Sequence, residues 1–295
     1  MKRALRRAAL GLALSLAAGG VARAAVSAEK PSRAARKSRG DAKPAAAAAL
    51  PADRLEALRG ALAGADDEAA IEAAGTLGAS AAPNAAEPLI EALAAGTSPA
   101  RLQAVLDGVI KLGQAHALRP DQTTIDALTL YAGHRATDVR KRAIQALATI
   151  SDSRATAPLV ERLGDAAPDV RAAAATALAE RHETKAAARM YGLLAQGDAG
   201  VAAPLAALAT PDLVPRIAEL AGTIDDEIIA AALGEYVKRA DVPEKLRVDV
   251  LRTIGRLSGA VATTALADYL ASVPAKEDRP SKHEAQKLLD QRSSN

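Results

Sequence analysis

From Pro51 onward, hydrophobic residues recur at helical spacing in short segments that turn residues separate. In the segment 138–150 the apolar side chains share one helical face, made by Val139, Ala143, Ala146, Leu147 and Ile150. Polar side chains, among them Arg140, Lys141 and Gln145, occupy the opposite face. A series of such amphipathic segments predicts helices that stack side by side and leave one continuous polar surface.

The segments form an ordered series of helical pairs. The sequence PLIEAL at 88–93 returns as PLVERL at 158–163, and a proline that can open a second helix, Pro99 or Pro168, follows each copy. Ser98-Pro99 and Thr210-Pro211 are typical helix starts, because a capping hydroxyl precedes a proline. We expect about six antiparallel hairpins. Their second helices are predicted near 100–113, 138–150, 169–180, 199–209 and 225–238, with a last pair spanning 244–272.

A second internal repeat fixes the length of one unit. The triplet Asp138-Val139-Arg140 returns 31 residues later as Asp169-Val170-Arg171. A period of this size is typical of stacked helical hairpins, in which each unit buries its apolar face against its neighbours. Over roughly residues 51–272 the pattern resembles the HEAT-repeat family, in its short HEAT-like (PBS-lyase-type) branch. Gly200-Val201-Ala202 stands where a third copy of the triplet would be.

The resemblance implies an all-α solenoid, a HEAT-like superhelix, and roles for particular residues. In HEAT-like proteins the aspartate and arginine of this motif link one repeat to the next, which here concerns Asp138, Arg140, Asp169 and Arg171. The second helix of each pair usually lines the concave face of the superhelix. On that basis the resemblance implies four partner-contact candidates: Arg101, Lys141, Gln145 and Arg247.

The chain divides into four parts by composition. Residues 1–24 have basic residues ahead of an uncharged stretch, Ala8 to Ala22, and end in Ala22-Arg23-Ala24, which predicts a signal peptide cut before Ala25. The apolar stretch is shorter than the ~20 residues that span a bilayer, which disfavours a membrane anchor and leaves no transmembrane segment in the mature chain. Residues 25–50 read as a disordered basic linker rich in alanine and proline, 51–273 as the repeat domain and 274–295 as a polar tail that either caps the last repeat or frays. We therefore expect an exported protein, periplasmic or secreted, in a bacterium.

The net charge of the repeat domain disfavours one class of partner, nucleic acids. Residues 1–24 contain five basic and no acidic side chains, so the net charge of +3 becomes −2 without them. Residues 25–43 contain six basic and two acidic residues, which leaves −6 for the rest. A repeat domain of this sign, without Phe or Trp to stack on bases, disfavours nucleic-acid binding. The basic residues within 30–43 are either a solvated tether or a weak contact for anionic envelope polymers.

Candidate catalytic chemistry is sparse. The chain has no cysteine, and its two His-Glu dipeptides, His182-Glu183 and His283-Glu284, are half of the set that the di-iron site of HEAT-like hydroxylases would need. We expect no cofactor, no metal and no catalytic residue. The sequence favours a non-catalytic scaffold or adaptor that binds a protein or peptide partner in the cell envelope. A HEAT-like enzyme, similar to a phycobilin lyase or a metal-dependent hydroxylase, and an envelope-polymer binder stay open as alternatives.

Overall fold

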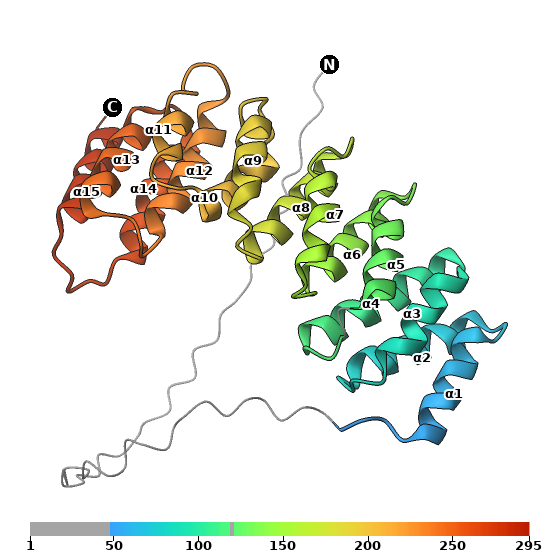
Figure 1. Ribbon diagram of the computed structural model, residues 1–295. Helices are drawn as coiled ribbons and strands as arrows, with labels where there is room; N and C mark the ends of the chain where they lie inside the picture. Colours follow the sequence, from blue (N-terminus) through green and yellow to red (C-terminus); the bar gives the residue numbers. More distant parts are fainter. Residues whose placement is uncertain (1–47, 119–120, 295) are drawn as a thin grey trace, which may run out of the picture. The chain divides into compact units, whose positions relative to one another are not determined.

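The computed structural model describes residues 48–118 and 121–294, which form fifteen α-helices (Figure 1). The predicted signal peptide, most of the predicted linker and its basic residues 30–43 lie outside the described residues. Within the described ranges no strand forms, and a single β-bridge joins Ala221 to Ile224. No helix among them combines the length and the apolar character that crossing a bilayer requires.

The helices form an α-solenoid of two layers, because helices pack against their partner in the pair and each second-layer helix packs against the next second-layer helix along the chain. The first layer contains α1 (Ala52–Ala63), α3 (Ala86–Ala95), α5 (Gln122–Ala132), α7 (Thr156–Arg162), α9 (Ala187–Leu194), α11 (Leu213–Ala218), α13 (Glu244–Arg256) and α15 (Pro280–Ser293). The second layer contains α2 (Asp67–Ala79), α4 (Pro99–Gln114), α6 (Thr137–Ala148), α8 (Pro168–Glu180), α10 (Ala202–Leu208), α12 (Asp226–Lys238) and α14 (Ala260–Ser272). Short 3₁₀ turns at 153–155, 184–186 and 199–201 precede α7, α9 and α10.

The predicted second helices agree with α4, α6, α8, α10 and α12, and the predicted last pair agrees with α13 and α14. The structure adds one pair ahead of them, α1 and α2. Ser98 caps α4 as expected, since its hydroxyl accepts a hydrogen bond from the Arg101 amide at 3.4 Å, with Pro99 in the first turn. The second predicted cap is wrong: Thr210-Pro211 forms a turn, and α11 begins only at Leu213.

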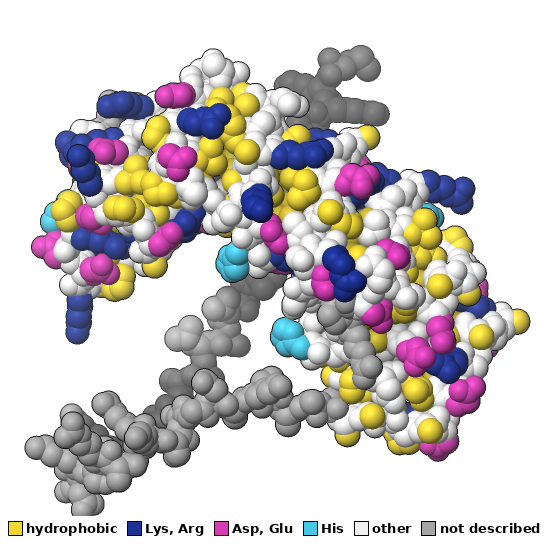
Figure 2. Space-filling model, in the orientation of Figure 1, with side chains coloured by type: hydrophobic (Ala, Val, Ile, Leu, Met, Phe, Trp, Pro, Cys, Tyr) yellow, Lys and Arg dark blue, Asp and Glu magenta, His cyan; other side chains and the backbone are white. Residues whose placement is uncertain are grey.

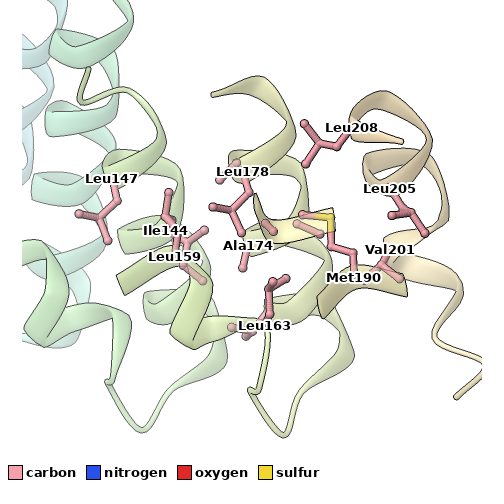
Figure 3. Packing of buried hydrophobic residues seen from close by; sticks show 14 of the residues in the cluster. Ile144, Leu147, Leu159, Leu163, Ala174, Leu178, Met190, Val201, Leu205 and Leu208 are labelled. Carbon is pink, nitrogen blue, oxygen red and sulfur yellow. The ribbon is translucent and has the colours of Figure 1, made fainter. Parts of the chain in front are cut away.

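One continuous hydrophobic cluster runs between the layers. Figure 3 shows its middle part, to which α6, α7, α8 and α10 contribute leucines and α9 contributes Met190. Two of the four tyrosines, Tyr236 and Tyr269, are among the largest fully buried side chains. They fill space that the small side chains of this core leave open.

Glycines bring neighbouring second-layer helices into close contact. A Cβ added to Gly78 of α2 would lie 2.6 Å from the Cα of Gly108 in α4. No side chain separates the two backbones at this point. The missing side chains therefore set the distance between α2 and α4.

Three second-layer helices end on a residue with left-handed backbone. Ala81 follows α2, His116 follows α4 and His182 follows α8, with φ of 52°, 55° and 55°. After α8 the Glu183 amide donates to the Leu178 carbonyl at 3.0 Å and the His182 amide to the Ala179 carbonyl at 3.0 Å. This is the Schellman arrangement, which usually has glycine at this position.

The C-terminal tail is a packed helix, so of the two expected forms the structure shows the cap. The Ser281 amide of α15 donates to a Glu244 carboxylate oxygen of α13 at 2.7 Å, and the Ser281 and Tyr269 hydroxyls lie 2.5 Å apart. Ala285 is fully buried against the last pair. The polar outer side of α15 then closes the apolar end of the stack.

Candidate partner-binding surface

The outer side of the second layer carries an open hollow of about 500 Å³ across α4, α6 and α8. Its apolar residues come from all three helices, and its polar residues cluster toward the C-terminal end of each helix. The apolar set is Ile110, Ala148, Ala173 and Ala177, and the polar set is Gln114, Gln145, Thr149, Thr176 and Glu180. Three successive repeats thus contribute to one surface, as a stack of amphipathic helices requires.

Gln145 lies in this hollow, whereas Lys141 lies one turn earlier on α6. The four-residue spacing places both side chains on the same helix face. Gln145 is exposed, and within the described residues its carboxamide has no hydrogen-bond partner. Lys141 is about one-third exposed, and its ammonium lies 3.6 Å from an Asp169 carboxylate oxygen of α8. Of the four partner candidates, Gln145 and Lys141 are the two at the surface of one helix.

Arg101 is held within the protein. Its guanidinium pairs with the Asp67 carboxylate of α2 and donates to the Gly64 carbonyl at 2.7 Å. The side chain is only 14% exposed. It joins the first two second-layer helices, and little of its side chain is accessible to a partner.

Arg247 is buried, so its prediction as a partner contact is wrong. It lies on α13 in the first layer, is 4% exposed, and donates to the carbonyls of Val237, Arg239 and Val242. The last two distances are 3.0 and 2.9 Å. Helical periodicity placed this residue on the polar face, but the loop after α12 folds over it and uses its donors.

The two motif arginines do link successive repeats. Arg140 donates to the Asp165 carboxylate at 2.8 Å, and Arg171 donates to the Asp198 carboxylate at 2.5 Å. Each arginine also donates to two carbonyls in the turn before its own helix. Burial opposes the charged form of Asp165, but the hydrogen bonds from Arg140 and the Ala167 amide outweigh it and hold the pKa of this carboxyl below its usual value.

Within the described residues Asp138 makes no link between repeats, contrary to the expectation, and Asp169 is not the acceptor of a motif arginine. Asp138 and Asp169 are exposed in the first turns of α6 and α8, where a carboxylate favours the positive end of the helix dipole. Asp169 reaches the neighbouring repeat only through Lys141. Sequence reasoning missed the real acceptors, Asp165 and Asp198. Their signal was a pair of aspartates 25 and 27 residues after the two arginines.

The two His-Glu dipeptides are far apart in the fold and separately engaged. Glu183 accepts a hydrogen bond from the Thr156 hydroxyl at 2.6 Å, next to the strained turn at His182. His283 of α15 lies 2.7 Å from an Asp278 carboxylate oxygen, and Glu284 pairs with Arg252. Among the described residues no three His, Cys, Asp or Glu side chains are grouped so that they could hold a metal ion.

A second hollow, of about 520 Å³, lies between α3 and α5 and has a different character. Its ionisable lining residues are Glu87, Glu91 and Asp121. Arg59 of α1 pairs with Glu91 at 3.1 Å and approaches Glu87 at 3.5 Å. Elsewhere the visible surface has acidic and basic side chains interspersed with apolar ones (Figure 2).

Comparisons with known proteins place the middle of the chain among HEAT repeats. Residues 125–211, from α5 to just beyond α10, match the model of the HEAT-repeat family and include both motif triplets. No curated protein matches the chain.

Solved structures of helical repeat proteins are also similar. One is the complex of CpcE and CpcF of phycocyanin lyase from Nostoc sp. PCC7120, with 18% identity, 85% of this chain and 98% of that chain covered, and a TM-score of 0.43. Another is an engineered protein, with 20% identity, coverage of 81% and 96%, and a TM-score of 0.36. A designed armadillo repeat protein shows 19% identity, coverage of 80% and 98%, and the same TM-score.

Proposed function

We propose that this protein is an exported, non-catalytic repeat scaffold of the bacterial cell envelope, which binds a protein or peptide partner on its second-layer helices. The observation that carries the proposal is the hollow across α4, α6 and α8 with the free carboxamide of Gln145 in it. Three repeats form it together, so it is a property of the stack and not of a single hairpin. A rigid stack presents such a surface without a conformational change.

Binding at this surface is tested by affinity capture from the protein's own envelope fraction, read by mass spectrometry. Residues 25–295 serve as bait, and a Gln145→Arg variant fills the hollow with a larger charged side chain. Gln291→Arg, at an exposed position on α15, makes the same chemical change away from the hollow. We expect a partner that the wild type and Gln291→Arg retain and that Gln145→Arg loses.

Two further measurements separate this function from its alternatives. Deletion of residues 30–43 should leave capture unchanged, because the proposal assigns no partner contact to that basic stretch. Metal analysis of the purified chain accompanies the capture. Stoichiometric iron without any protein partner would overturn the scaffold proposal in favour of an enzyme.

Export rests on the character of residues 1–24 and needs its own test. The C-terminally tagged chain should be recovered from the periplasm or medium, and N-terminal sequencing should begin at Ala25. Recovery in the cytoplasm with Met1 retained would contradict export and leave the binding surface untouched.

A further inference from the structure

The hollow across α4, α6 and α8 has a negative electrostatic character from two independent sources. It lies toward the C-terminal ends of three successive second-layer helices, with Gln114, Thr149 and Glu180 at or next to those ends. Each helix C-terminus carries a partial charge of about −0.5. Glu180 adds a full carboxylate at the end of α8, where the helix dipole disfavours it.

Most cations near the hollow are already engaged, whereas Lys111, in the last turn of α4, is exposed and makes no ion pair among the described residues. Arg142 of α6 pairs with Asp107 of α4 at 2.8 Å, and Lys141 pairs with Asp169. Arg181, next to Glu180 in the chain, is turned toward the preceding loop, where it donates to the Asp152 carbonyl at 2.9 Å. No lysine or arginine is among the residues that line the hollow. A cationic group from outside would therefore meet the Glu180 carboxylate, which has no ion-pair partner among the described residues.

The remaining lining suits an aliphatic stem and a peptide backbone. Ile110 and Ala173 offer apolar contact, whereas the carboxamides of Gln114 and Gln145 each have donors and an acceptor without partners in the described residues. Lysine and arginine combine an apolar stem with a charged head, so both halves of such a side chain find matching surface here.

We propose that this hollow accepts a lysine or arginine side chain of an extended partner segment, with Glu180 as its counter-ion. The stem packs on Ile110 and Ala173, and the carboxamides of Gln114 and Gln145 hydrogen-bond to the peptide groups on either side. This inference rests on the proposed function, since it names the chemistry of the partner that the second layer binds.

The test selects binders from a random octapeptide library displayed on phage, with the purified protein as target. We expect enriched peptides to share one lysine or arginine at a fixed position. Replacing that residue by norleucine, or Glu180 by Gln, should each weaken binding about fivefold or more, as measured by fluorescence anisotropy. The two changes together should weaken binding by no more than either alone, because they remove the same contact.

The control removes one carboxylate from the other hollow. Glu91→Gln should leave peptide affinity within about twofold, because it lies between α3 and α5. Affinity that falls with Glu91→Gln and not with Glu180→Gln would overturn the proposal and place the cation in the acidic hollow. A salt-sensitive dimer of the chain that Gln145→Arg abolishes would overturn it by making a second copy the occupant.

Failure of this inference and failure of the proposed function would give different binding results. Peptides that Gln145→Arg excludes, but that carry no basic residue and ignore Glu180→Gln, would overturn the lysine assignment and leave the scaffold surface intact. Peptides that bind regardless of Gln145→Arg would overturn both. Circular dichroism of each variant confirms that the fold is unchanged.

Discussion

The contact between Gly78 and Gly108 predicts opposite effects for two glycine-to-alanine substitutions on the same helix. In Gly78→Ala the new Cβ lies 2.6 Å from the Gly108 Cα and 3.0 Å from its carbonyl oxygen, both of which are backbone atoms. In Gly75→Ala, three residues earlier on α2, the new Cβ has no atom within 4 Å. Both changes replace the poorest helix former except proline by the best one.

The magnitudes follow from these distances. Two carbons attract best at about 3.5–4.0 Å, so α2 and α4 must separate by about 1 Å to admit the methyl group of Gly78→Ala. Overpacking of this kind costs about 1–3 kcal/mol. The higher helix propensity of alanine offsets up to about 1 kcal/mol of that cost. Gly75→Ala keeps the gain alone, so the free energy of unfolding should rise by about 0.5–1 kcal/mol for Gly75→Ala and fall by about 1 kcal/mol for Gly78→Ala.

Urea unfolding followed by far-UV circular dichroism measures both variants beside the wild type. The gain in propensity is common to the two substitutions, so the difference between their midpoints reports the α2–α4 contact. Equal slopes of the transitions show that the same surface is exposed in each case. If Gly78→Ala stabilised the protein as much as Gly75→Ala, the close approach of α2 and α4 would be refuted.

Three further predictions concern other parts of the stack. His182→Gly should raise the free energy of unfolding by about 1 kcal/mol in urea titrations, because glycine adopts the left-handed backbone after α8 without strain; an unchanged midpoint would contradict this. Arg171→Ala should lower it by about 2 kcal/mol, because the buried Asp198 carboxylate then keeps only its hydrogen bond from the Gly200 amide. Arg135→Ala, at an exposed loop position, should have little effect. Burial opposes the charged form of Glu244, but hydrogen bonds from Ser281 outweigh this effect and hold the pKa of the carboxyl below its ordinary value of 4.5. The contact therefore stabilises the fold above pH 4.5, and this stabilisation is lost as the pH falls through the lowered pKa. The free energy of unfolding, measured in urea, should accordingly fall between about pH 5 and pH 3, and it should fall less in Glu244→Gln.

Helical periodicity predicted the second helices from α4 onward, because leucine, valine and isoleucine mark their buried faces. The pair α1 and α2 escaped assignment for a physical reason. In α2 the buried positions include Ala70, Ala73 and Ala74, while an alanine also occupies the exposed position 79. Alanine packs against a neighbouring helix and tolerates solvent almost equally, so a helix made largely of alanine shows little contrast between its faces.

Helical periodicity alone predicted which candidate site residues are exposed, and it succeeded for some of them only. Gln145 and Lys141 lie where the 3.6-residue period places them, on the outer side of α6. Arg247 occupies an equally polar position in its own helix, but the loop after α12 covers it. The path of that loop depends on tertiary packing. The position of a charged residue on a helical wheel therefore does not settle whether solvent reaches it.

Several arginines make the same kind of contact along the stack, which explains why they are not free to bind a partner. An arginine near the end of one helix reaches back to a carbonyl at or just after the end of the helix two positions earlier. The pairs are Arg162 with Ala132, Arg181 with Ile150, Arg239 with Ala209 and Arg292 with Leu257. A planar guanidinium supplies several donors at once, stays charged and favours the negative end of a helix dipole, which a lysine ammonium does less well. These arginines join successive repeats through their donors, so partner-binding residues are better sought among the exposed amides, lysines and carboxylates of the second layer, where Gln114, Gln145 and Glu180 lie together.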